Sequence, residues 1–211
     1  MSKSAKQNRP PLYYRIEYYK RVSNPLLWVE KANELMAAAE TLEPSIDAYW
    51  NSLRIEPDRG LVSETPETEG KQLLQAPYFM MMAFALENHF KAILVADNDY
   101  SGELLRAGKL PEILKNHDLV KLAKITGLSL DDVELSLLTR LSVNSIWQGR
   151  YPAPANCIEL NNMPIKQGKS VFTAYLSPMD IGNLHRLTKR LKEYTISKIA
   201  SMDKDRLSQL I

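Results

Sequence analysis

The sequence contains few of the residues on which many metal and cofactor sites depend. Among its 211 residues there is one cysteine, Cys157, and there are three histidines, His89, His117 and His185. A single cysteine excludes a disulfide framework within the chain and favours a reducing, cytoplasmic location. Three scattered histidines make a zinc site a poor fit. We therefore expect no metal and no cofactor.

Several common signatures are also missing. The chain has no phosphate-binding Gly-x-x-x-x-Gly-Lys loop, no Gly-x-Gly-x-x-Gly, no Cys-x-x-Cys and no His-Glu-x-x-His. No apolar segment of the secretory type lies near the N-terminus, so we expect no secretory signal. The longest apolar run, residues 76–86, is too short to span a bilayer and is followed at once by polar residues. It predicts a buried core helix in a protein outside the membrane.

Charge is distributed unevenly although the net charge is only +2. Residues 1–21 carry six basic residues and one acidic residue, and residues 180–211 carry seven basic and four acidic residues. Basic ends on an acidic body are suited to a polyanion or to a partner's acidic face, and they also occur as ordinary solvated surface.

The first 22 residues form a basic segment in which paired tyrosines alternate with basic residues. The tyrosines are Tyr13, Tyr14, Tyr18 and Tyr19. Such a segment could stack on RNA bases, or it could pack its rings on the domain or on a second copy of the chain. We treat residues 1–22 as an N-terminal arm and residues 23–211 as a single domain.

Helical periodicity dominates the remaining sequence. Asn24 followed by Pro25 predicts the start of a helix, and Pro44 predicts an interruption near Leu42. Residues 55–71 are rich in Pro, Gly, Ser and Glu and predict a loop. The segment from Pro77 to Ala96 is apolar on nearly all sides, which predicts a central buried helix.

The second half of the chain predicts further helices. Gly127 predicts the end of one helix, and Ser129 with Asp132 predicts a capping box at the start of the next. The strings CIEL, residues 157–160, and VFTAYL, residues 171–176, are candidates for a small hairpin, and the last helix begins at Ser177-Pro178. Since strand signals are scarce, we predict an all-α, antiparallel up-and-down helical bundle with a small hairpin insert.

Three strings in this order carry a family resemblance: ENHFKAIL, residues 87–94; HDLVKLAKITG, residues 117–127; and GRYP, residues 149–152. Together they resemble the HEPN (higher eukaryotes and prokaryotes nucleotide-binding) domains. The resemblance covers about residues 77–154 together with the C-terminal helix, residues 178–202.

The resemblance implies a helical bundle that forms a homodimer with a cleft at the two-fold axis. Many members of the family are metal-independent endoribonucleases of toxin–antitoxin, abortive-infection or other phage-defence systems, and others are non-catalytic binding modules. The nuclease members carry an arginine four to six residues before a histidine. No arginine precedes His89, His117 or His185 at that spacing, so the best-known catalytic pair of the family is absent.

Candidate site residues come from the same three strings. Cleavage of RNA without metal needs a base, an acid and a cation. Arg150 is suited to hold a phosphate, and Tyr151 or His117 to carry a proton. Ligand-orienting residues would be Glu87, Asn88 and Lys91.

For most of these residues we expect structural roles instead. Glu87 and Lys91 are four residues apart, the spacing of a supporting helix pair, and on an apolar helix they should bind each other or Arg150. Arg150 lies near a predicted helix end, where it would neutralise Glu87 or cap carbonyl groups.

Three functional interpretations follow. The first is a HEPN-like module with a nucleic-acid-linked or defence-linked binding role, whose partners would be a second copy, RNA or a nucleotide, and an antitoxin or other defence protein. The alternative is a divergent metal-independent endoribonuclease toxin that acts through Arg150, Tyr151 and His117. The third is a helical scaffold whose tyrosine-rich arm docks a partner.

Overall fold

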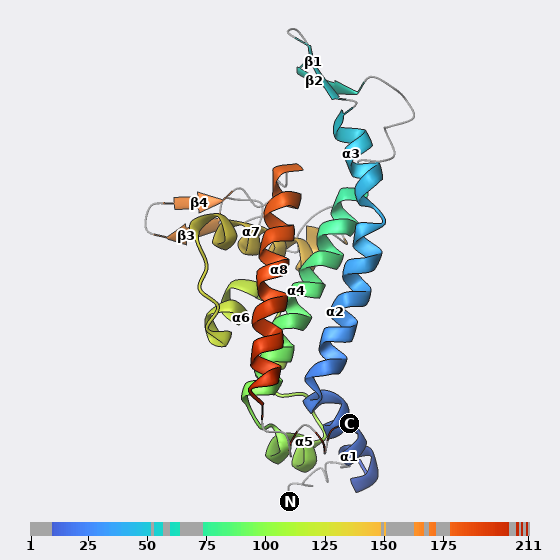
Figure 1. Ribbon diagram of the computed structural model, residues 1–211, viewed down its shortest axis with the longest axis vertical. Coiled ribbons are helices and arrows are strands. Elements are labelled where there is room, and N and C mark those ends of the chain that lie inside the picture. The colour runs from blue at the N-terminus through green and yellow to red at the C-terminus, as the bar shows by residue number, and fades with distance from the viewer. Residues whose placement is uncertain are drawn as a thin grey trace, which may run out of the picture.

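The protein folds as an all-α helical bundle with two short hairpins, as the computed structural model in Figure 1 shows. The all-α prediction is therefore confirmed. The structure describes residues 10–51, 53–56, 60–63, 74–148, 150, 163–166, 169–171, 178–202, 206, 208 and 210.

Three long helices lie side by side along the length of the molecule (Figure 1). They are α2 (Pro25–Glu40), α4 (Gln75–Asp97) and α8 (Pro178–Ala200). Asn24 caps α2 as predicted, because its Oδ1 accepts a hydrogen bond from the Leu26 amide at 3.0 Å while Pro25 occupies the first turn.

The directions of these helices follow from the contacts between them. Lys91 of α4 lies over the ring of Trp28 in α2, and Tyr78 of α4 donates to Glu43 just beyond the end of α2. The two helices are therefore antiparallel. In contrast, α4 and α8 run in the same direction. His185 near the start of α8 contacts Tyr78 near the start of α4, and Lys198 near the end of α8 contacts Asp97 at the end of α4. This differs from the strictly alternating order that the sequence predicted.

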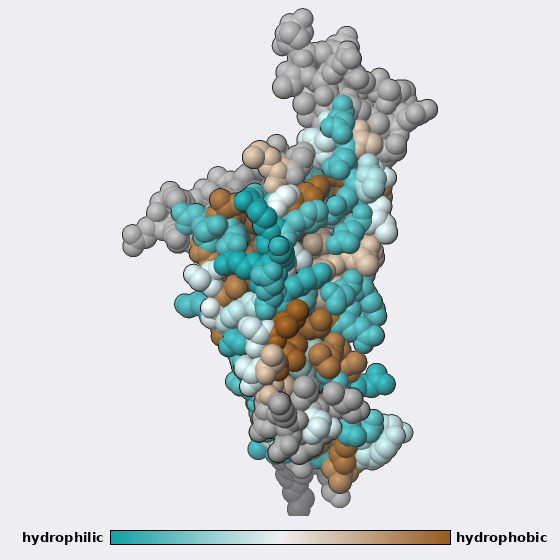
Figure 2. All heavy atoms as spheres, viewed as in Figure 1, coloured by the Kyte–Doolittle hydropathy of each residue, from teal (hydrophilic) through white to brown (hydrophobic). Residues whose placement is uncertain are grey.

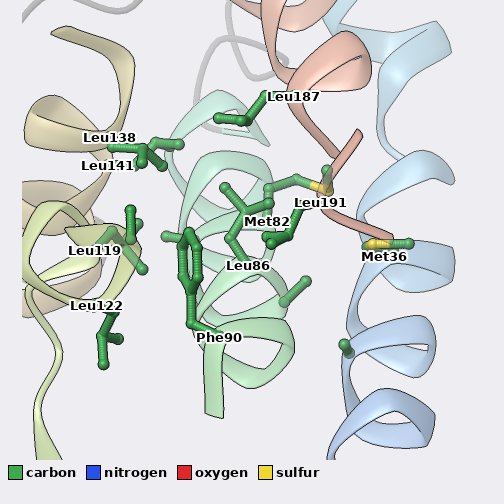
Figure 3. Packing of buried hydrophobic residues seen from close by; sticks show 14 of the residues in the cluster. Met36, Met82, Leu86, Phe90, Leu119, Leu122, Leu138, Leu141, Leu187 and Leu191 are labelled. Carbon is green, nitrogen blue, oxygen red and sulfur yellow. The ribbon is translucent and has the colours of Figure 1, made fainter. Parts of the chain in front are cut away.

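The core is built around α4. Figure 3 shows Met82, Leu86 and Phe90 of α4 between residues of the flanking helices. Met36 of α2 and Leu187 and Leu191 of α8 lie on one side. On the other side lie Leu119 and Leu122 of α6 (Leu119–Thr126) and Leu138 and Leu141 of α7 (Asp132–Val143). α4 is long and apolar enough to cross a membrane, yet 78% of its apolar stretch is buried inside the protein. It is the apolar centre of the bundle, as the sequence predicted.

Shorter elements connect α4 to α8. They are α5 (Ser101–Ala107), the 3-10 helix η3 (Glu112–Lys115), α6 (Leu119–Thr126), α7 (Asp132–Val143) and the π-helical turn η4 (Asn144–Gln148). Gly127 ends α6 with φ 77°, a left-handed conformation suited to glycine, as predicted. The predicted capping box is displaced: the cap of α7 is Asp131 with Glu134, not Ser129 with Asp132.

The N-terminal segment forms a helix, α1 (Leu12–Ser23), which packs against α5 at one end of the bundle (Figure 1). Tyr18 and Tyr19 pack against the core, while Tyr13 and Tyr14 are exposed. Residues 1–9 of the predicted arm lie outside the described residues.

The helix predicted to be interrupted near Leu42 is interrupted there, since α2 ends at Glu40 and α3 (Glu43–Asn51) begins after a turn. A hairpin of β1 (Leu53–Glu56) and β2 (Gly60–Ser63) then occupies part of the predicted loop, so the loop prediction is wrong for these residues.

A second hairpin pairs β3 (Met163–Lys166) with β4 (Lys169–Val171). It lies in the predicted insert. The first predicted strand, residues 157–160, lies outside the described residues; of the second, Val171 belongs to β4 and residues 172–176 lie outside the described residues.

Candidate functional site

The motif residues of α4 form a buried ion pair. Lys91 Nζ donates to Glu87 Oε1 at 2.5 Å, and each residue is only 5% exposed. The pair arises because the two residues are one helical turn apart on a helix that is covered on nearly all sides. Lys91 Nζ also lies 5.8 Å from the centre of the Trp28 ring, a cation–π contact that further stabilises the buried ammonium group. The predicted Glu87–Lys91 pair is confirmed.

His117 completes this cluster from outside the helix. Its Nδ1 lies 2.9 Å from Glu87 Oε2, and its side chain is 57% exposed. Because an ionised carboxylate only accepts hydrogen bonds, this contact places a proton on Nδ1 and directs Nε2 away from Glu87. Asp118, the next residue, caps α6 by accepting from the Lys121 amide and so fixes the segment that carries His117.

The other predicted site residues do not join the Glu87 cluster through a described contact. Asn88 donates to the carbonyl of Phe84 at 2.7 Å and is thus held by its own helix. Arg150 is exposed and donates to the carbonyls of Ser145, at 2.9 Å, and Ile146. It therefore caps the end of η4, one of its two predicted structural roles. Tyr151 lies outside the described residues.

A second group of polar residues joins α3, α4 and α8. His185 Nε2 lies 2.7 Å from Glu43 Oε1, and the Tyr78 hydroxyl donates to the same oxygen at 2.8 Å. Burial, followed by the hydrogen bond to Glu43, raises the pKa of Tyr78 far above its usual range, so the phenol remains a donor. Glu43 and His185 are 142 positions apart, and no local pattern in the sequence connects them.

This polar group borders a pocket of about 560 Å³. It is lined by Met82 of α4, by the end of α2, by the start of α3 and by one side of α8. The lining residues are Glu40, Glu43, Met82, His185, Thr188, Lys189, Lys192, Glu193 and Ile196. Such a volume lies within the range of small-molecule sites.

His89 is a buried histidine with no hydrogen-bond partner for either ring nitrogen among the described residues. It lies on α4 and is 1% exposed. Burial, with a smaller contribution from the positive charge of Lys192, lowers the pKa of His89 to about 4. The ring is consequently neutral near neutral pH and cannot serve there as a cationic contact for phosphate.

The start of α8 is held to α7 by a buried, two-pronged ion pair. Arg140 Nη1 and Nη2 donate to Asp180 Oδ2 and Oδ1, each at 2.7 Å. The two residues are 40 positions apart, so local spacing in the sequence does not connect them.

The outer side of α8 is basic. Arg186, Lys189 and Arg190 are exposed, and Figure 2 shows hydrophilic residues gathered over this helix. Arg190 pairs with Glu134 of α7, whereas Lys189 has no ion-pair partner among the residues that the structure describes. This leaves at least one cation on α8 available to an anionic ligand.

Within the described part of the chain, no three His, Cys, Asp or Glu side chains come close enough to hold a metal ion. Comparisons with protein-family models, curated proteins and solved structures found no match to this chain.

Proposed function

We propose that this chain is a HEPN-type helical module that binds RNA through the basic side of α8 and does not require catalysis for its role. The observation that carries this proposal is the exposed row of Arg186, Lys189 and Arg190. Cations on one helix face suit the regularly spaced phosphates of a nucleic acid, and binding of this kind needs no base-specific contact.

The arrangement of the motif residues supports a binding role. The Glu87 carboxylate uses one oxygen for Lys91 and the other for His117, so this buried cluster is satisfied by the protein itself. Arg150 uses its guanidinium to cap carbonyl groups. As in the family that the sequence resembles, the module would act in the cytoplasm as a homodimer, with a defence-linked partner such as an antitoxin.

A filter-binding assay with labelled single-stranded RNA in EDTA tests the proposal. We expect intact RNA that is retained in a salt-sensitive manner. The double variant R186A/K189A should bind more weakly, and the slope of log K against log salt should fall in magnitude by about 1.4, because about 0.7 is lost for each phosphate contact removed.

The matched control is Lys121→Ala, which removes an exposed lysine from α6. It should leave both the affinity and the salt slope unchanged. Equal retention by the wild type and R186A/K189A, or equal weakening by Lys121→Ala, would show that α8 is not the binding surface.

The alternative, a divergent metal-independent endoribonuclease, is favoured by one observation: the exposed imidazole of His117 is oriented by the buried carboxylate of Glu87. A neutral His117 could accept the 2′-hydroxyl proton at Nε2, and Glu87 would stabilise the imidazolium that forms. The same RNA assay decides between the functions. Cleavage in EDTA that is lost in His117→Ala but kept in Lys121→Ala would favour the enzyme, whereas intact RNA favours the binding module.

A further inference from the structure

The lining of the pocket between α2, α4 and α8 combines opposite charges with the apolar side chains of Met82 and Ile196, and this combination specifies a kind of ligand. We propose that it binds a small zwitterionic molecule with an aliphatic body. The inference is independent of RNA binding, although Lys189 belongs to both surfaces.

The anionic end of the ligand is assigned to the α8 wall. Lys189 and Lys192 both line the pocket and have no ion-pair partner among the described residues. They are separated by about one helical turn and therefore project from the same side of α8. Two adjacent ammonium groups offer up to six donors to a carboxylate or a phosphate.

The cationic end is assigned to Glu40. This residue lies at the end of α2, on a different helix from the two lysines, and has no ion-pair partner among the residues that the structure describes. Glu43 is already engaged by Tyr78 and His185. Because the lining holds three carboxylates beside its two lysines, a simple anion would meet repulsion as well as attraction. A molecule with both charges matches both sets of groups.

The body of the ligand would lie on apolar groups. Met82 and Ile196 line the pocket, and the methylene stems of the two lysines extend the apolar surface. Thr188 lines it as well; it is 6% exposed and its hydroxyl has no hydrogen-bond partner among the described residues. A buried hydroxyl without a partner is costly, and a polar group of a ligand would satisfy it after rotation of the side chain.

The test uses three probes of matched chain length: ε-aminocaproate, which carries both charges, caproate and n-hexylamine. The full chain is labelled at its methionine and isoleucine methyl groups, and the Met82 and Ile196 resonances are followed by NMR during titration. We expect ε-aminocaproate to shift both resonances saturably and at lower concentration than either singly charged probe.

Two variants that keep side-chain volume locate the charges. Lys192→Met and Glu40→Gln should each weaken binding of ε-aminocaproate by about three- to fivefold, the value of an exposed ion pair. Glu30→Gln, at an exposed position of α2 outside the lining, is the matched control and should bind as the wild type does. Thermal unfolding confirms that each variant is folded.

Two results would overturn the inference: no saturable shift with any of the probes, or binding of caproate or n-hexylamine equal to that of ε-aminocaproate. Failure here is distinguishable from failure of RNA binding. Glu40→Gln removes an acidic group from the pocket without touching the basic row on α8, so it should not weaken RNA retention.

Discussion

Two polar side chains on α4, separated by only one position, differ in whether the fold provides them with hydrogen-bond partners. Glu87 has a partner for each carboxylate oxygen, Lys91 and His117. His89 has no described partner for either ring nitrogen and is almost fully buried. Buried polar groups without partners destabilise a fold, so His89 is a position where the native residue is not optimal for stability.

We predict that His89→Leu, a change of similar volume, stabilises the protein most strongly at mildly acidic pH. The pKa of His89 is about 4 in the folded protein and about 6.5 when unfolded. Between these pH values the unfolded chain binds more protons than the folded protein does. The stability that depends on a neutral His89 is therefore fully present above about pH 6.5 and is lost as the pH falls toward 4. Because of His89, the free energy of unfolding of the wild type should fall by about 2 kcal/mol between about pH 7 and about pH 5.

Urea unfolding at the two pH values measures this effect as the difference between the variant and the wild type, since other groups titrate in both proteins. Asn88→Ala, at the neighbouring half-buried position, serves as a control without a titrating side chain. An identical pH dependence for His89→Leu and the wild type would show that His89 does not resist protonation in the folded state.

At the residue scale, spacing within a helix predicted the Glu87–Lys91 pair because both partners lie on one helical face. The third member, His117, is thirty positions from Glu87. The same holds for Arg140 and Asp180, which are forty positions apart. Local spacing carries no information on which distant side chains meet, so these contacts could not be predicted.

At the scale of elements, most helix boundaries follow from local chemistry. Asn24 with Pro25 begins α2, and Gly127 ends α6, because each supplies a backbone geometry or hydrogen bond that a helix end requires. The cap of α7 was misplaced by two residues because Ser129, Asp131 and Asp132 are all good caps by type. Only the structure shows that Asp131 and Glu134 bond each other's amides, at 2.8 and 3.0 Å.

We therefore predict that Asp131→Ala lowers the free energy of unfolding by about 1 kcal/mol, the usual value of an N-cap. Ser129→Ala, the matched control at the cap that the sequence suggested, should change it by less than about 0.5 kcal/mol. Denaturant unfolding measures both. A larger loss for Ser129→Ala than for Asp131→Ala would contradict the observed cap.

At the scale of the whole molecule, the relative direction of α4 and α8 could not be predicted. This direction depends on the path of the segment of about eighty residues between the two helices, which returns the chain to the start of α4. Hydrophobic periodicity carries no information on that path. The C-terminal residues then close the opposite end of the bundle. Arg206 donates to the carbonyls of Val95, at 2.6 Å, and Ala96, at 3.2 Å, and also to that of Asn98.

Removal of this closure should weaken the fold. Arg206→Ala is predicted to lower the free energy of unfolding by about 1–2 kcal/mol, because a charged donor is lost from carbonyls at the end of α4. Lys124→Ala, which removes an exposed cation from α6, is the control and should have little effect. Circular dichroism during thermal unfolding provides the measurement, and equal melting temperatures for the two variants would contradict the proposed contribution of Arg206.

The shared direction of α4 and α8 has an electrostatic consequence. The peptide dipoles of two parallel helices reinforce each other, so partial negative charge accumulates where both helices finish and partial positive charge where both begin. At the finishing end of α4 the cationic Arg206 donates to the carbonyls of Val95, Ala96 and Asn98. This cation offsets part of a field that a strictly alternating bundle would have largely cancelled through its backbone alone.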